Sequence, residues 1–152
     1  CGAKYCLIGH SEARQFLTET NVIIKQKFDQ LEQESLQPIL CIGEPQEIKE
    51  AAKTIGYLTE QLSLIDSDQE NLIIAYEPIW SIGTGLVPEI DDIQLAVDSI
   101  RCKFHKPVKV LYGGSLNSSN ASSILDKTDI DGLLVGGASL NPKEFAKIAQ
   151  LC

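Results

Sequence analysis

The sequence contains no methionine in 152 residues, although 43% of its residues are hydrophobic. A translated chain begins with methionine, and a cysteine at position 1 is not a usual processed start. We therefore expect the sequence to be part of a longer protein. Its length is enough for one domain and too short for two comfortable ones.

Basic residues are also few. The chain has 13 Lys and Arg against 21 Asp and Glu, which gives a net charge of -8. Nucleic acids and anionic membranes both bind through basic surface, so we expect neither as a partner. An anionic substrate would have to be held by local dipoles rather than by a cationic field.

No apolar run approaches the ~20 residues of a membrane span, and no secretory signal or transit peptide is visible. The five cysteines are odd in number and lack CxxC spacing, which disfavours a disulfide scaffold or a zinc site. Cys6 and Cys41 fall in predicted strands, where a thiol packs as a small hydrophobe. We therefore expect a cytoplasmic protein that binds no metal.

What the chain does contain is a series of apolar, strand-like runs, each followed by a helical pattern. The runs cover residues 5–8, 38–42, 72–76, 108–112 and 130–135. Apolar periodicity predicts helices around residues 23–31, 48–65, 90–100 and 121–125. A last helix is expected to begin at Asn141-Pro142, an N-cap followed by proline at the first helical position.

Repeated strand–helix units with strands that are apolar throughout predict a parallel α/β sheet. A flavodoxin-like open sheet of five strands fits this length. Every polar motif, however, follows the carboxyl end of a strand, which is the active-site face of a (β/α)8 barrel. We therefore expect residues 1–152 to form one incomplete barrel of five units, with strands in sequence order. Eight units would need about 250 residues.

The stretch AYEPIWSIGTG, residues 75–85, places Glu77 at the carboxyl end of an apolar strand. Pro78, Gly83 and Gly85 follow in a loop, and the glycines permit torsions that other residues avoid. A surface acid is the alternative interpretation. The apolar residues on either side favour a desolvated carboxylate of raised basicity instead. Such an acid beside a glycine-rich loop suits proton chemistry under a movable lid.

The first strand ends in the motif GHSE, which contains His10. A lone histidine is more often structural than functional. Here Gly9 allows close approach of the backbone, and Ser11 and Glu12 begin a helix. The positive end of a helix disfavours imidazolium, so we expect a neutral ring that donates a hydrogen bond.

Two Gly-Gly pairs, at 113–114 and 136–137, follow the last two strands. One such pair usually means only a tight turn. Two pairs, each before a helix, suit a cradle of backbone N–H groups for phosphate. Barrels bind phosphate after strands seven and eight, so the visible strands would be numbers four to eight. Glu44, in the motif CIGE, is interpreted as structural.

These motifs resemble triosephosphate isomerase, whose fold is the (β/α)8, or TIM, barrel. AYEPIWSIGTG resembles its loop-six signature, GHSE resembles its electrophile motif, and the likeness runs from GAKYCLIGHSE to DGLLVGGASLNPKEF. The resemblance implies that His10 is the electrophile and Glu77 the catalytic base. It also implies four contacts with the substrate phosphate, from Gly83, Ser115, Gly136 and Gly137.

Further roles follow from the same resemblance alone. Tyr112 and Ser115 would hold the closed lid, and Ser11 would hold Glu77 while the lid is open. Arg101 and Asp129 would form a structural ion pair. The implied activity interconverts dihydroxyacetone phosphate and glyceraldehyde 3-phosphate without a cofactor, in glycolysis and gluconeogenesis.

The chain departs from the family pattern in three ways. The family's amino-terminal strands carry an Asn and a Lys that contact substrate, and a loop that joins its usual homodimer; none is present. Ala13 stands where the first of two arginines is usual, and Pro88 stiffens the second lid hinge. We therefore expect the 152-residue piece alone to lack activity.

Two alternatives remain open at this point. Another phosphate-binding barrel enzyme, such as an aldolase or a biosynthetic isomerase, would share the two Gly-Gly loops without needing GHSE and AYEP. A non-catalytic remnant is favoured by the missing lysine-bearing strand.

Overall fold

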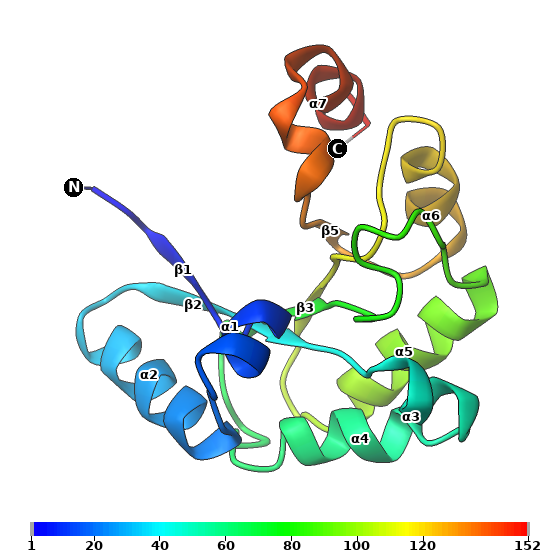
Figure 1. Ribbon diagram of the computed structural model, residues 1–152. Coiled ribbons are helices and arrows are strands. Elements are labelled where there is room, and N and C mark those ends of the chain that lie inside the picture. Colours follow the sequence, from blue (N-terminus) through cyan, green and yellow to red (C-terminus); the bar gives the residue numbers. More distant parts are fainter. Residues whose placement is uncertain (1, 152) are drawn as a thin grey trace.

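The computed structural model describes residues 2–151, which form a single sheet with helices packed against it (Figure 1). The strands are β1 Tyr5–Ile8, β2 Gln37–Ile42, β3 Ile73–Tyr76, β4 Lys109–Tyr112 and β5 Gly132–Leu133. The helices are α1 Ser11–Phe16, α2 Asn21–Gln33, α3 Gln46–Glu50, α4 Thr54–Gln61, α5 Ile90–Cys102, α6 Ala121–Lys127 and α7 Pro142–Ala149, with a short 3₁₀ helix, η1, at Gly137–Leu140.

The five strands are all parallel and lie in the order β1-β2-β3-β4-β5. Ile42 pairs with Tyr76, and Tyr76 with Tyr112, so the carboxyl ends of the central strands meet at one edge of the sheet. This confirms the expected open sheet in sequence order and excludes a flavodoxin-like order, in which the first two strands exchange places. Within residues 2–151, no strand covers the outer edge of β1 or β5.

The hydrophobic core lies between the sheet and the helices on its outer side. Figure 1 shows α2, α4 and α5 along one side of the sheet. Phe28 of α2, Leu58 of α4 and Val97 of α5 are buried, and they face fully buried strand residues such as Leu40 and Ile74. Every residue of β2 and β3 is buried or half-buried, so side chains on both faces of these strands are shielded, which agrees with their continuous apolar runs.

Side-chain caps fix where α2 and α7 begin. Thr20 accepts a hydrogen bond from the Ile23 amide at the start of α2. Asn141 accepts from the amides of Lys143 and Glu144 at the start of α7, which confirms the expected cap. None of the helices within residues 2–151 combines the length and apolar character needed to cross a membrane.

The helix expected over residues 48–65 is wrong as a continuous element, because α3 ends at Glu50 and α4 begins at Thr54. Ala52 has φ 54°, and the Lys53 amide donates to the Ile48 carbonyl, which closes the end of α3. That geometry is a left-handed helix terminus, here formed without the usual glycine. The last strand is also shorter than expected, at two residues.

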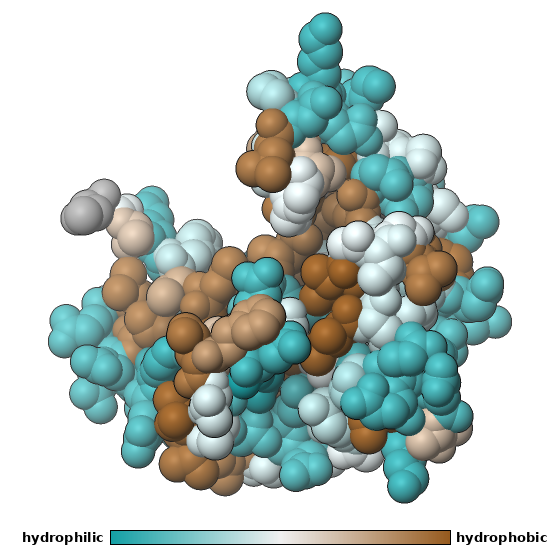
Figure 2. Space-filling model, viewed as in Figure 1, coloured by the Kyte–Doolittle hydropathy of each residue, from teal (hydrophilic) through white to brown (hydrophobic). Residues whose placement is uncertain are grey.

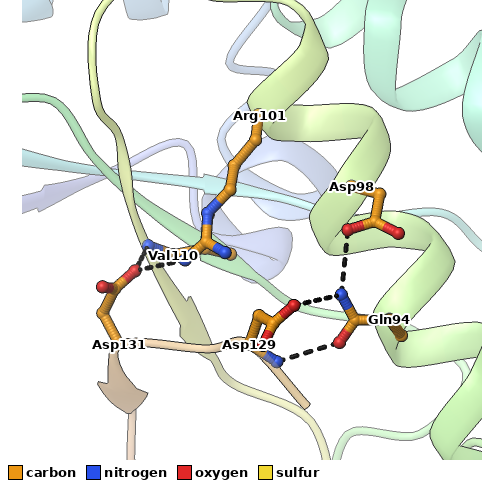
Figure 3. Close-up of polar contacts among 6 residues, drawn as sticks. All are labelled: Gln94, Asp98, Arg101, Val110, Asp129 and Asp131. Atoms are coloured by element: carbon orange, nitrogen blue, oxygen red, sulfur yellow. Dashed lines mark hydrogen bonds and ion pairs between the residues drawn. The ribbon is translucent and has the colours of Figure 1, made fainter.

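The ion pair expected between Arg101 and Asp129 is wrong as well. Arg101 Nη2 lies 2.9 Å from Asp131 Oδ2, which also accepts the Val110 amide at 2.7 Å (Figure 3). Asp129 instead pairs with the Gln94 amide group, accepting through Oδ2 at 3.0 Å and donating through its backbone N–H at 2.9 Å. Gln94 thus uses the hydrogen-bonding groups of Asp129, while Arg101 pairs with Asp131.

Candidate active site

Glu77 follows β3 directly and is held by the backbone of its neighbour strand. Its amide donates to the Ile42 carbonyl at 2.7 Å, which continues the β2–β3 ladder by one residue. Its side chain is only 3% exposed. Burial raises the pKa of the Glu77 carboxyl, and His10, the Ser11 amide and the Cys41 thiol offset part of that rise. A carboxylate whose pKa is raised is a stronger base near neutral pH.

Gly43 sets how closely β2 and the Glu77 backbone approach. A Cβ on Gly43 would lie 1.7 Å from the carbonyl oxygen of Glu77, a distance that no side chain tolerates. The backbone of Gly113 also lies close to the Glu77 side chain, since a Cβ on Gly113 would lie 3.0 Å from Glu77 Cγ. Both glycines therefore determine where the carboxylate stands.

His10 is the N-cap residue of α1 and is partly exposed. Its Nδ1 accepts a hydrogen bond from the Glu12 amide at 3.3 Å. A ring nitrogen that accepts carries no proton, so the neutral tautomer bears its proton on Nε2. Nε2 lies 3.4 Å from Glu77 Oε1. The ring thus presents an N–H donor beside the carboxylate.

Arg14 was not singled out from the sequence, although it fixes the backbone before His10. Its guanidinium donates to the Gly9 carbonyl at 2.7 Å, to the Cys41 carbonyl at 3.2 Å and to Asn21 Oδ1 at 2.8 Å. These contacts tie the end of β1 to β2 and α2. The available signal was its spacing, four residues after His10 on the same helix.

The loop 78–88, between β3 and α5, lies against the turn 113–115 after β4. The Gly85 amide donates to Ser115 Oγ at 3.2 Å, and Ser115 Oγ donates to the Ser81 carbonyl at 2.6 Å. Gly83 and Gly85 have φ of 70° and 80°, in the region that favours glycine. The expected contact of Tyr112 with the lid is absent, because its buried hydroxyl has no hydrogen-bond partner within residues 2–151.

Glu44 does not line the space between His10 and Glu77. It is fully buried, and its Oε1 accepts from Trp80 Nε1 at 3.0 Å and from the Tyr76 hydroxyl at 3.2 Å. Burial raises the pKa of the Glu44 carboxyl, and these two hydrogen bonds oppose the rise. The contacts anchor the start of the loop 78–88, in keeping with a structural interpretation.

One pocket of about 390 Å³ opens at the carboxyl ends of the strands. Its lining includes all six site residues expected from the sequence, which are His10, Glu77, Gly83, Ser115, Gly136 and Gly137. A pocket of this size suits a small ligand. Within residues 2–151, no group of three or more His, Cys, Asp or Glu side chains is arranged to hold a metal ion.

The pocket brings together a buried carboxylate, an imidazole N–H donor and the two Gly-Gly loops. A base and a donor so placed are able to move a proton from a carbon acid while polarising an adjacent carbonyl. The glycines of the two Gly-Gly loops line the pocket without side chains, which suits close approach of a phosphate, although the Gly113 amide is already donated to the Tyr76 carbonyl.

Comparison with known proteins gives a consistent result. The sequence model of the family described as triosephosphate isomerase matches residues 1–152. The triosephosphate isomerases of Trichodesmium erythraeum and Nostoc punctiforme are each 41% identical over 98% of this chain. That of Alkaliphilus oremlandii is 39% identical over 97% of the chain.

The chain spans 63% of the length of the Trichodesmium and Nostoc relatives and 64% of the Alkaliphilus one. The match covers both motifs of the pocket and all five strands, since it runs the whole length of the sequence. The chain belongs to the triosephosphate isomerase family.

Proposed function

We propose that this chain is the carboxyl-terminal portion, barrel strands four to eight, of an enzyme that interconverts dihydroxyacetone phosphate and glyceraldehyde 3-phosphate. The observation that carries the proposal is the His10–Glu77 pair, 3.4 Å apart in a pocket that the Gly-Gly loops also line. The strand assignment is supported by those loops, which follow the last two strands, where barrels bind phosphate. As part of the same proposal, the enzyme acts in the cytoplasm on phosphorylated trioses and needs no cofactor.

In this mechanism Glu77 removes a proton from the carbon next to the substrate carbonyl and returns it to the neighbouring carbon. The Nε2–H of His10 polarises the carbonyl oxygen and then exchanges protons with the two oxygens of the enediolate. A neutral histidine paired with a glutamate base is the arrangement for which triosephosphate isomerases are themselves the standard example. The accepting Nδ1 of His10 keeps the ring in the required tautomer.

Phosphate binding falls to backbone groups rather than to cationic side chains. Gly83 in the loop 78–88, Ser115 after β4, and Gly136 and Gly137 after β5 all line the pocket. Backbone N–H groups at these turns would hold a dianion by hydrogen bonds and local dipoles. This accommodates a chain whose net charge is -8.

The loop 78–88 would exclude water once substrate is bound. Water exclusion strengthens the electrostatic contacts and suppresses loss of phosphate from the enediolate. Closure of this loop is a standard example of a catalytic lid in the same family. The contacts of Gly85 and Ser81 with Ser115, one of the proposed phosphate-binding residues, support this role for the loop.

The test is to complete the barrel. The chain would be joined to the amino-terminal part of the Trichodesmium erythraeum relative. The rate of isomerisation would then be measured from glyceraldehyde 3-phosphate and, separately, from dihydroxyacetone phosphate. Expected is activity that Glu77→Gln lowers at least about 100-fold, since a positioned base contributes on that order. His10→Gln should also lower turnover, because an amide donates a hydrogen bond but does not relay a proton.

The control for this experiment is the chain alone, which should show no isomerase activity. A completed protein with native far-UV circular dichroism but no isomerase activity would contradict the proposal and favour a non-catalytic remnant. Aldol cleavage of a sugar bisphosphate by the completed protein would favour the other class of barrel enzyme instead.

A further inference from the structure

Ser81, in the loop 78–88, has a fully buried hydroxyl that joins three parts of the chain. Its Oγ donates to the Leu86 carbonyl, at the far end of the same loop, at 2.7 Å. The same oxygen accepts the Ser115 amide, in the turn after β4, at 3.0 Å. The hydroxyl therefore uses both its donor and an acceptor site, and each partner comes from a segment that borders the pocket.

The Ser81 backbone reinforces the same junction. Its carbonyl accepts from Ser115 Oγ at 2.6 Å and from Thr84 Oγ1 at 2.9 Å. Ser115 Oγ in turn accepts the Gly85 amide at 3.2 Å. The loop and the turn are thus connected by two reciprocal hydrogen bonds between Ser81 and Ser115, and the Gly85 amide adds a third.

Tyr112, which the family resemblance assigned to this task, does not perform it here. Its hydroxyl lies near Ser81 Oγ but has no hydrogen-bond partner within residues 2–151, and the Ser81 proton is donated to Leu86. Pro88, at the end of the loop, is buried and has no backbone N–H to offer a hydroxyl. Ser81 supplies the contacts that Tyr112 lacks.

We propose that Ser81 is a positioning residue that latches the loop 78–88 down on the turn 113–115. Lifting the loop off the turn would separate the Ser81 hydroxyl from the Ser115 amide and the Ser81 carbonyl from the Ser115 hydroxyl. A buried donor or acceptor left without a partner is costly, so the hydroxyl favours the loop-down state. The hydrogen bonds that form the latch do not depend on any catalytic activity of the chain. Its effect on substrate binding, however, rests on the proposed isomerase function.

The first experiment uses the chain's single tryptophan, Trp80, which precedes Ser81 in the loop. With 5-fluorotryptophan incorporated, the ¹⁹F spectrum of the chain reports the loop at one position. Ser81→Ala should raise the population of a second loop state about tenfold, the effect of losing one to two hydrogen bonds. Tyr112→Phe removes an equally buried hydroxyl that has no partner, and it should leave the spectrum unchanged.

Equal spectra for Ser81→Ala and the unsubstituted chain, or a larger change in Tyr112→Phe, would overturn the latch. A second measurement covers the case in which Ser81→Ala does not fold. Amide exchange of the unsubstituted chain should show Ser115 protected at least about 100-fold over a free peptide, because its N–H donates to a buried oxygen. Exchange of Ser115 at the free-peptide rate would overturn the proposal.

The completed barrel separates positioning from a merely structural role. Ser81→Ala should raise KM and lower kcat together, as lid residues do. A completed barrel without isomerase activity would defeat the proposed function, while the ¹⁹F and exchange results would still decide on the latch.

Discussion

Glu44 and Glu77 are two buried carboxyl groups at the same end of the sheet, and the pKa of each is raised first by burial. A raised pKa in the folded state means that folding favours the protonated form. The stabilising contribution is then fully present below the unfolded value of about 4.3 and is lost as pH rises through the folded pKa. Both groups should therefore make the chain less stable on moving from mild acid to neutral pH.

Glu44→Gln tests this at a residue outside the pocket. The glutamine oxygen still accepts from Trp80 and Tyr76, while its neutral amide no longer titrates. We expect the fall in free energy of unfolding between about pH 4.3 and 8 to become shallower, by urea titration across that range. Adding Glu77→Gln should flatten the curve further. A Glu44→Gln chain with the original pH dependence would contradict the assignment.

Individual residues differ in how far the sequence alone points to them. His10 and Glu77 were identified because each sits in a short motif at the end of a strand. Ser81 was missed because its partner Ser115 lies 34 positions away, and nothing local marks a buried hydroxyl. Arg101 was paired with the wrong aspartate, because position along the chain does not reveal that Gln94 already holds Asp129.

Gly43, directly after β2, has less room for a side chain than any other glycine of residues 2–151. Gly43→Ala would place a methyl group 1.7 Å from the Glu77 carbonyl oxygen, and only a shift of one strand end relieves it. We expect a loss of about 3 kcal/mol in the free energy of unfolding, the upper range for overpacking. Denaturant titration measures it, together with displacement of Glu77 from the pocket.

Gly56 provides the matched control for that substitution. It lies in α4, and a Cβ there meets no atom within 4 Å. Gly56→Ala should stabilise the chain by about 0.5–1 kcal/mol, because alanine loses less entropy than glycine in a helix. Similar effects of the two substitutions would show that the close approach at Gly43 is not as tight as described.

The ion pair that joins Arg101 of α5 to the segment before β5 uses Asp131 rather than Asp129. Asp131→Ala removes both the Arg101 pair and the acceptor for the Val110 amide. We expect a loss of about 1–2 kcal/mol, most of it from the unpaired amide, since an exposed ion pair contributes little. Asp129→Ala should lose less in the same denaturant titration, and the reverse order would contradict the pairing in Figure 3.

Most of the element order could be predicted because apolar runs and helical periodicity are local properties of the sequence. The break between α3 and α4 could not, because it falls at Ala52, a strong helix former that here has a positive φ. The short length of β5 could not be predicted from the sequence either. An apolar run at 130–135 is equally consistent with a long strand, and only pairing with β4 limits it to two residues.

At the scale of the whole molecule, the sheet is an arc with two uncovered edges. Figure 2 shows apolar surface across the hollow side between the amino-terminal strand and α7. On β1, Tyr5 is 59% exposed and Leu7 48%, although β2 and β3 are largely buried. A further cavity of about 540 Å³ opens at the amino ends of the strands, where Tyr5 and Lys109 line it. Additional strands would cover these surfaces.

The uncovered edges predict self-association of the isolated chain. Exposed strand edges with apolar side chains pair readily with other chains. We expect the mass measured by light scattering to rise with concentration, and Tyr5→Lys to reduce that rise. Leu95→Lys, at an exposed position on α5 away from the edges, should have little effect. A chain that stays monomeric at all concentrations would contradict the open-edge description.

The most direct test of the central claim, that Glu77 is the base of a triose-phosphate isomerase, is Glu77→Asp in the completed barrel. Aspartate keeps the charge but withdraws the carboxylate by about 1 Å, and such a displacement can lower a rate on the order of 100-fold. The substitution leaves untouched the proposed phosphate contacts at Gly83, Ser115, Gly136 and Gly137. We therefore predict that kcat falls about 100-fold while KM changes little, a loss confined to the transition state. Near-normal turnover in Glu77→Asp would show that another group removes the proton.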